Sequence, residues 1–261
     1  MALLELKGVR KAYGTTEVLG GIDLSIEKGE FVSIVGFSGS GKTTLLSILA
    51  GLLQPDSGSV LLNGVPVHEP GRERAVVFQN YSLLPWMTVD ENVALGVDQA
   101  FSDWPAERRR AHVEKYVAMV KLTAARNKKP HELSGGMRQR VAVARALAMR
   151  PKVLLMDEPF AALDVQTRAR MQDFLLDVWR DSGASVLFVT HHIDEAVALA
   201  DRVVVFTSRP GRIKTIMPID LPRPRNLFSR EAEALRIQLT DLLRDEVDRA
   251  FAEQEALASA L

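Results

Sequence analysis

Residues 36–43 read Gly36-Phe37-Ser38-Gly39-Ser40-Gly41-Lys42-Thr43, which has the form G-x-x-x-x-G-K-S/T of a phosphate-binding loop. The apolar run Phe31–Val35 before it predicts a buried strand, and Lys42–Ala50 after it predicts a helix ended by Gly51. A loop between a buried strand and a helix brings backbone N–H groups and the positive end of the helix dipole to one point. The stretch therefore predicts a nucleotide site on an α/β fold.

The loop residues have separate expected tasks. Glycine lets the backbone curl around phosphate oxygens without Cβ clashes, Lys42 reaches the β and γ phosphates, and the Thr43 hydroxyl ligates Mg²⁺. The full expected nucleotide-binding set of this loop is Gly36, Phe37, Ser38, Gly39, Ser40, Gly41, Lys42, Thr43 and Thr44. The alternative is a Gly/Ser-rich turn, but a chance match arises only about once in a hundred chains of this length. The expected ligands are therefore ATP and Mg²⁺.

The composition narrows the other functions open to the chain. Lys plus Arg and Asp plus Glu each total 33, so the formal net charge is zero and we expect no nucleic-acid partner. Without cysteine, disulfides and cysteine metal sites are excluded. Met1–Val9 does not resemble a signal peptide, and no apolar run approaches the roughly 18 residues of a membrane helix. We expect a soluble chain whose membrane role requires a partner.

Three further apolar runs have the length of strands, namely Val153–Met156, Val186–Val189 and Val203–Phe206. Because they are continuously apolar, we expect them to be buried on both faces, as in a parallel sheet covered by helices. The N-terminal part differs, with short strand patterns through Leu24 and a hairpin turn predicted at Asn63-Gly64. The pattern between about 85 and 150 is mainly helical and predicts a lobe inserted into the α/β core.

The Pro-rich segment Leu221–Arg225 cannot continue a regular element and marks the end of the core. We therefore expect an ATPase domain over residues 1–225 and a helical extension over 226–261. Ser229 can cap that helix, which places on one stripe Leu235, Leu239, Leu242, Leu243 and Phe251. We expect the stripe to dock on the core; a dedicated partner surface is the alternative.

Two acidic residues, Asp157 and Glu158, follow the strand predicted at Val153–Met156. They leave the carboxyl end of the sheet, where ligands bind in open α/β folds. Asp157 suits a Mg²⁺ contact, and Glu158 suits polarising the attacking water. An Asp-Glu-Pro can also simply end a strand, but the phosphate loop favours the functional interpretation.

A second motif lies further along the chain and reads Leu133-Ser134-Gly135-Gly136-Met137-Arg138-Gln139-Arg140. It resembles the signature of ABC transporter ATP-binding subunits. Ser134 can cap a helix whose first N–H groups are exposed by Gly135 and Gly136, making a second anion site. The resemblance runs from about Leu3 to Arg225. It implies a P-loop NTPase (RecA-like) core with an N-terminal antiparallel β subdomain and an inserted α-helical subdomain.

The resemblance also implies a dimer and further site residues. Two subunits, identical or paralogous, pack head to tail, so that Ser134, Gly135 and Gly136 of one cover the ATP of the other. Tyr13 matches the residue that stacks on adenine, and Gln79 matches the one that senses Mg²⁺ and the γ-phosphate. Asp164 ends a loop that communicates across the dimer, and His191 matches the histidine that contacts the γ-phosphate. The neighbouring His192 leaves an exchange of roles open; we assign the role to His191.

The narrower signals are Phe78–Trp86, Thr190–Ala196 and Leu221–Arg225, which look like importers of nitrate, sulfonate, taurine and related anions. The residues of these segments favour nitrate or nitrite as the cargo. This inference is associational, because in such systems the substrate never touches this subunit. Sulfonate, taurine and bicarbonate are the alternatives. The resemblance implies membrane permease subunits, a periplasmic or lipoprotein substrate-binding protein, and a peripheral place on the cytoplasmic face of the inner membrane.

Other protein classes fit less well. A soluble ABC protein of repair or translation typically carries two cassettes or a long coiled coil, and a P-loop kinase or GTPase lacks the signature. An exporter fits the Pro-Arg-Pro-Arg tail less well. In the family, the groove near Gln79–Val89 receives a helix of the permease, for which the apolar residues are Leu83, Leu84, Trp86 and Met87. Each of them can equally fill the helical lobe.

Overall fold

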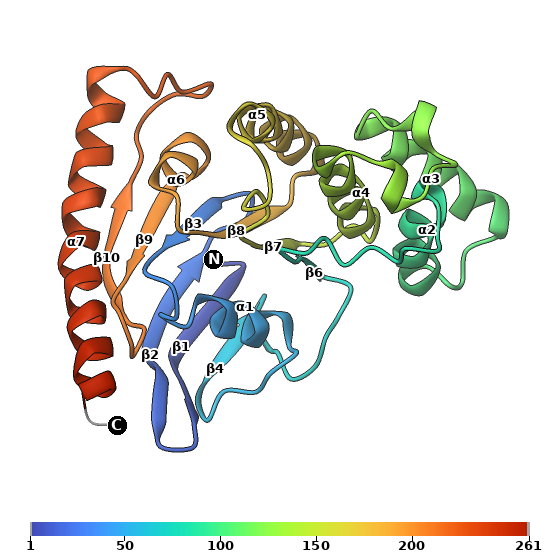
Figure 1. Ribbon diagram of the computed structural model, residues 1–261. Helices are drawn as coiled ribbons and strands as arrows, with labels where there is room; N and C mark the ends of the chain where they lie inside the picture. The colour runs from blue at the N-terminus through green and yellow to red at the C-terminus, as the bar shows by residue number, and fades with distance from the viewer. Residues whose placement is uncertain (1, 260–261) are drawn as a thin grey trace. The chain divides into compact units, whose positions relative to one another are not determined.

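The computed structural model describes residues 2–259, with the side chains of residues 2–246 and 248. The chain forms two compact units. One contains the residues up to Pro70 together with those from Leu187 onward, and the other contains Gly71–Val186. The second unit is therefore an insertion between two halves of the first, as the colour gradient in Figure 1 allows the reader to follow.

The first unit begins with an antiparallel sheet in the order β2-β1-β4-β5. Its strands are β1 (Leu4–Tyr13), β2 (Thr16–Ile26), β4 (Ser57–Leu62) and β5 (Val65–Pro66). The turn between β4 and β5 is Asn63-Gly64, with φ of 50° and 77°. Two successive positive φ values match the twist of a two-residue hairpin, which confirms the predicted turn and the N-terminal antiparallel β subdomain.

The remaining strands of this unit lie in the order β10-β9-β3-β8. They are β3 (Phe31–Val35), β8 (Ser185–Thr190), β9 (Arg202–Phe206) and β10 (Ile213–Pro218). Strand β9 pairs in parallel with β3 and antiparallel with β10. Every residue of β3 is buried, as its unbroken apolar sequence predicts. Helix α1 (Lys42–Ala50) follows β3 through the phosphate loop and ends at Gly51 in the left-handed conformation.

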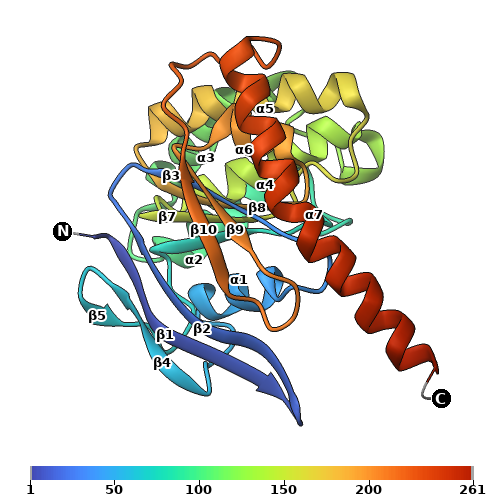
Figure 2. The same cartoon turned by 90° about the vertical axis from the view of Figure 1, so that its left-hand side faces the viewer.

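Two more helices complete the first unit, α6 (Ile193–Leu199) and α7 (Arg230–Ser259). Ser229 caps α7, since its Oγ accepts a hydrogen bond from the Ala232 N–H at 3.2 Å. Helix α7 packs against α6 and β9 (Figure 2). Leu239 is buried, and the three half-buried members of its stripe are Leu235, Leu242 and Leu243. This confirms that the stripe docks on the core, while Phe251 lies outside the described side chains.

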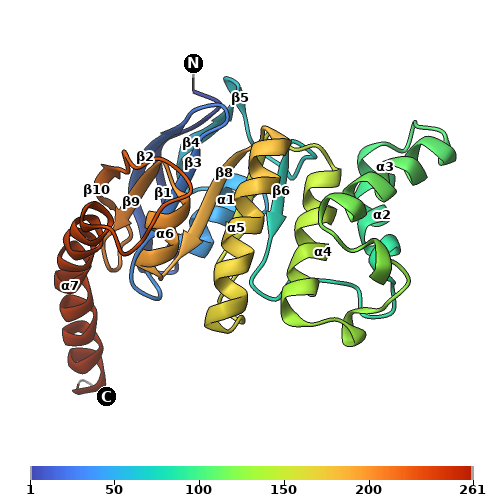
Figure 3. The same cartoon turned by 90° about the horizontal axis from the view of Figure 1, so that it is seen from above.

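The second unit holds a parallel pair, β6 (Arg74–Val77) and β7 (Val153–Asp157). Its helices are α2 (Val89–Ala100), α3 (Ala106–Met119), α4 (Gly135–Ala148) and α5 (Val165–Ser182), with short 3₁₀ turns at Thr123–Ala125 and Pro130–Glu132. Helices α2, α3 and α4 pack on one another (Figure 3), which confirms the helical lobe predicted from the sequence. Among the described residues, none of the helices combines the length and the hydropathy needed to cross a bilayer.

Candidate nucleotide-binding site

The phosphate loop of the first unit encloses its own lysine. The Lys42 ammonium donates hydrogen bonds to the carbonyl oxygens of Gly36 at 2.9 Å and Phe37 at 2.8 Å, and the residue is 5 % exposed. The N-cap of α1 is Gly41, so no side chain caps the first N–H groups of this helix, and its first turn contains no acid. The helix dipole and the ammonium therefore direct positive charge to the same place.

The glycines of this loop are required by their surroundings as well as by their torsions. Gly41 has a φ of 89°, and a Cβ there would lie 2.9 Å from the Val18 carbonyl oxygen and the Leu19 side chain. A Cβ on Gly36 would lie 3.0 Å from that of Phe206. Only glycine leaves room for the loop to curl at these positions. A backbone cradle with a lysine at its centre fits the phosphates of a nucleotide.

Two other predicted site residues of the first unit lie at the end of a strand or directly after it. Tyr13 closes β1 and is 54 % exposed, and the Lys11 ammonium lies 5.9 Å from the centroid of its ring. His191 follows β8 directly and is exposed, whereas His192 is half-buried with its N–H bonded to the Thr190 Oγ1 at 3.0 Å. The same Thr190 hydroxyl donates to the buried Glu195 at 2.6 Å. This fixed turn leaves His191 as the more accessible of the two imidazoles.

In the second unit the parallel pairing of β6 and β7 sets Val77 opposite Met156. Gln79 and the acidic pair therefore leave the same end of two adjacent strands. Asp157 is the last residue of β7 and is 8 % exposed. Glu158 has a φ of 43°, a left-handed conformation that is uncommon outside glycine and costs on the order of 1–3 kcal/mol. The surrounding fold therefore holds Glu158 in a backbone conformation that a non-glycine residue does not prefer.

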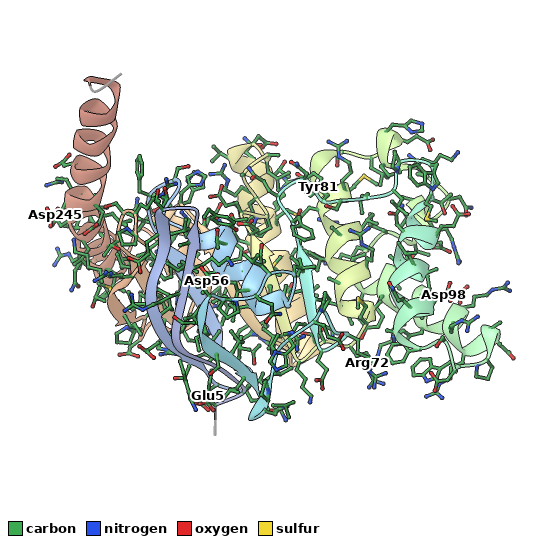
Figure 4. All side chains as sticks on the ribbon, turned by 90° about the horizontal axis from the view of Figure 1, so that it is seen from below. Glu5, Asp56, Arg72, Tyr81, Asp98 and Asp245 are labelled. Carbon is green, nitrogen blue, oxygen red and sulfur yellow. The ribbon has the colours of Figure 1, made fainter. Side chains whose placement is uncertain are left out.

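The segment after Gln79 is fixed by Arg145, a residue that the sequence analysis missed. Tyr81 and Ser82 both have positive φ, and Arg145 of α4 donates hydrogen bonds to their carbonyl oxygens at 2.9 and 2.7 Å. Burial lowers the pKa of the Arg145 guanidinium. Tyr81 itself is buried in this unit, where Figure 4 labels it. The signature helix thus braces the loop that carries Gln79.

A second brace, also missed, comes from Asn92 of α2. This residue is fully buried, and its amide oxygen accepts the Leu84 N–H at 2.9 Å. Its amide nitrogen contacts three carbonyl oxygens at 2.9–3.2 Å, those of Leu84, Met87 and Thr88. The only sequence signal was a polar residue among the apolar positions of a helix. Because buried polar groups must be paired, Asn92 defines the path of this loop.

The signature residues begin α4 as predicted. The Ser134 Oγ accepts the Met137 N–H at 3.3 Å. A Cβ on Gly135 would lie 3.1 Å from the Leu163 side chain, and one on Gly136 would lie 3.0 Å from that of Thr167. The two glycines therefore also allow α4 to pack closely on the chain that follows Glu158, a structural task that the sequence analysis did not assign.

Asp164 occupies the N-cap of α5. Its Oδ1 accepts the Thr167 N–H at 2.9 Å, and this hydrogen bond lowers the pKa of the Asp164 carboxyl. The residue thus has a capping role in the subunit by itself. The described part of the chain contains no cluster of three or more His, Asp or Glu side chains that could hold a metal alone. The oxygen atoms of Thr43, Gln79 and Asp157 are of the kind that Mg²⁺ takes as ligands, and Mg²⁺ usually keeps several waters besides.

The two units thus hold different parts of the predicted set. The first contains the phosphate loop, Tyr13 and His191, and the second contains Gln79, the acidic pair and the signature. A phosphate loop between a buried strand and a helix, with acids ending a strand of the same fold, defines a P-loop nucleotide-binding protein.

The chain belongs to the ABC transporter family, whose model matches residues 19–161. It is 52 % identical over 208 residues to the bicarbonate transport ATP-binding protein CmpC of Synechococcus elongatus, covering 79 % of this chain and 31 % of that protein. It is 52 % identical over 205 residues to the nitrate import ATP-binding protein NrtC of the same organism, covering 78 % and 31 %. The chain thus spans about a third of the length of these relatives.

A solved structure supports the fold. The dimeric post-hydrolysis state of an ATP-binding cassette bound to ADP and Pi superimposes with a TM-score of 0.72 at 32 % identity. The match covers 84 % of this chain and all of the other. The predicted P-loop NTPase fold is thereby confirmed.

Proposed function

We propose that this chain is the ATP-binding and ATP-hydrolysing subunit of an ABC importer for a small anion, with nitrate or nitrite as the cargo. The observation that carries the proposal is the phosphate loop with Lys42 at its centre, on a chain that also holds the Ser134–Gly136 helix start. Residues 1–225 form the ATPase domain, with a helical subdomain over about 85–150, and residues 226–261 form an extension.

Within one subunit, the chemistry divides among residues with distinct properties. Lys42 and the start of α1 bind the phosphates, and Tyr13 stacks on the base. Glu158 orients and deprotonates the attacking water, while His191 donates to the γ-phosphate. Bound Mg²⁺ would be held by Thr43, Gln79 and Asp157 and would offset phosphate charge.

A second ATP-binding subunit completes the site in this proposal. The N–H groups at Ser134–Gly136 form a helix start suited to an anion, and in a head-to-tail pair they would face the γ-phosphate held by the partner's loop. The related cassette of known structure is described as dimeric, which supports this arrangement. ATP binding then closes the pair, and hydrolysis reopens it.

The membrane partner is a pair of permease subunits on whose cytoplasmic side this chain sits, together with a substrate-binding protein. The loop braced by Arg145 and Asn92 offers the contact. Trp86 on this loop is 64 % exposed, whereas the half-buried apolar residues are Leu83, Leu84 and Met87. Tryptophan is enriched among the residues that dominate interface energies.

Trp86→Ala should lower anion uptake in cells about thirtyfold, because truncating an interface tryptophan that dominates binding typically costs about 2 kcal/mol, which is about thirtyfold in affinity. ATP hydrolysis by the isolated subunit should stay within about twofold, since the exposed indole lies outside the proposed chemistry. Phe228→Ala removes another exposed aromatic side chain and serves as the matched control. Equal uptake by both variants would remove Trp86 from the interface.

The cargo is tested by uptake of labelled anions in cells that lack this subunit and in cells that express it. Nitrate and bicarbonate are both small planar oxyanions, and relatives named for each are 52 % identical to this chain, so identity alone does not separate them. We expect nitrate uptake to depend on the subunit. Dependence of bicarbonate, sulfonate or taurine uptake instead would replace the proposed cargo and leave the ATPase intact.

A further inference from the structure

The turn between β9 and β10, Thr207–Arg212, lies against the phosphate loop. The Gly211 N–H donates to the Val18 carbonyl oxygen at 2.8 Å, and the Gly20 N–H donates to the Gly211 carbonyl oxygen at 3.0 Å. A Cβ on Gly211 would collide with the carbonyl oxygen of Ser40 inside the phosphate loop. The turn and the loop therefore meet backbone to backbone, with no room for a side chain between them.

The same turn contacts the beginning of the phosphate loop. A Cβ on Gly36 would lie 3.0 Å from that of Phe206, which directly precedes the turn, and Arg209 donates to the Gly39 carbonyl oxygen at 3.5 Å. The turn is also fixed internally, since the Thr207 hydroxyl donates to the Pro210 carbonyl oxygen at 2.8 Å. A shift of this turn would thus be felt along the phosphate loop, because packed backbone deforms little.

The C-terminal helix holds the turn through Glu246. This carboxylate is 1 % exposed, and its Oε2 accepts hydrogen bonds from the Ser208 N–H at 2.9 Å and the Ser208 hydroxyl at 3.3 Å. Its Oε1 pairs with the Lys214 ammonium at 3.0 Å, and Lys214 also donates to the Leu242 carbonyl oxygen at 2.8 Å. Burying a carboxylate is costly unless it is paired in this way, so the contact fixes helix and turn relative to each other.

A second ion pair links the same helix to α6. Arg236 of α7 pairs with Asp194 at 2.6 Å, in the first turn of α6 and three residues after His191. Helix α7 thus contacts the element that follows the histidine and the turn that abuts the phosphate loop. Both belong to the first unit.

We propose that Glu246 is a positioning residue for the nucleotide site: through Ser208 it holds the turn that supports the phosphate loop, and this support raises nucleotide affinity. The inference rests on the proposed binding of nucleotide at Gly36–Thr43. Its physical basis is that a binding constellation must be held within about 0.5 Å, which requires locked supporting residues. The role of the C-terminal extension is then to set affinity.

Isothermal titration of the full chain with ADP and Mg²⁺ tests this, because the phosphate loop proposed to bind ADP lies within one subunit. Glu246→Ala should weaken binding about tenfold. Glu246→Gln should bind within about threefold of the wild type, since its amide oxygen can still accept the Ser208 N–H. The matched control is Asp245→Ala. Asp245 directly precedes Glu246 and also pairs with Lys214, at 3.4 Å, but its side chain is 69 % exposed (Figure 4). The affinity of the Asp245→Ala chain for ADP should equal that of the wild type.

Wild-type affinity in a folded Glu246→Ala chain would overturn the inference, as would equal weakening by Asp245→Ala. A wild-type chain that binds no ADP would instead refute the proposed nucleotide site. If Glu246→Ala does not fold, hydrogen exchange on the wild type decides the question. Coupling between two sites is reciprocal, so ADP with Mg²⁺ should slow exchange of the Ser208 N–H. An unchanged exchange rate there would contradict the inference.

Discussion

Glu158→Gln is expected to lower the rate of ATP hydrolysis at least about 100-fold, because a positioned general base contributes typically 10²–10⁴-fold. The substitution keeps the size and hydrogen-bonding shape of the side chain but removes the charge that withdraws a proton from water. The left-handed backbone at this position, with a φ of 43°, is equally accessible to glutamine. Fold and nucleotide binding should therefore survive.

The measurement is steady-state phosphate release with saturating ATP and Mg²⁺, together with the molar mass in solution. With hydrolysis blocked, the dimer should persist in the presence of ATP, so the variant should dimerise more readily than the wild type. Glu107→Gln on α3, an exposed acid in the same unit, controls for the loss of one charge. Near-normal hydrolysis by Glu158→Gln would show that another group acts as the base.

Lys42→Ala should weaken nucleotide binding about 100-fold, the second largest expected effect. A hydrogen bond to a charged group contributes about 1.5–3 kcal/mol, and this ammonium lies within a loop that presents N–H groups to the same anion. The side chain also donates to the carbonyl oxygens of Gly36 and Phe37, so its removal loosens the empty loop as well.

Titration with ADP and Mg²⁺ measures this loss, and the exposed Lys28→Ala gives the matched control within the same unit. Arginine cannot restore these contacts, because its planar guanidinium does not fit the enclosed space that the compact lysine ammonium occupies. Lys42→Arg should therefore also bind poorly. An affinity within threefold of the wild type for Lys42→Ala would exclude this loop as the phosphate site.

The local elements around the phosphate loop could be predicted because their signals are contiguous. Strand β3, helix α1 and the left-handed end at Gly51 all follow from neighbouring residues, and so do the Ser134 and Ser229 caps. The P-loop fold was predictable for the same reason. The catalytic and binding roles of the site residues stay predictions, which the variants above are designed to test.

Long-range side-chain contacts could not be predicted from the same signals. Arg145 looks like an ordinary helix residue until the carbonyl groups of Tyr81 and Ser82 are placed beside it. Glu246 reads as one more charge on an exposed helix, yet it is buried 38 residues from its partner Ser208. Such contacts depend on where the chain returns in space, and hydrophobic periodicity carries no information about that.

Because one unit is inserted within the other, translation delays the pairing of strands from the two halves of the first unit. The Phe31 N–H at the start of β3 bonds to Asp201, 170 residues further along the chain. A ribosome at typical speed needs roughly 10–30 s to make that stretch, and until then β3 lacks its β9 partner. The nascent phosphate loop thus precedes the sheet that supports it, and nucleotide cannot assist the folding of the first unit until the inserted unit has been translated.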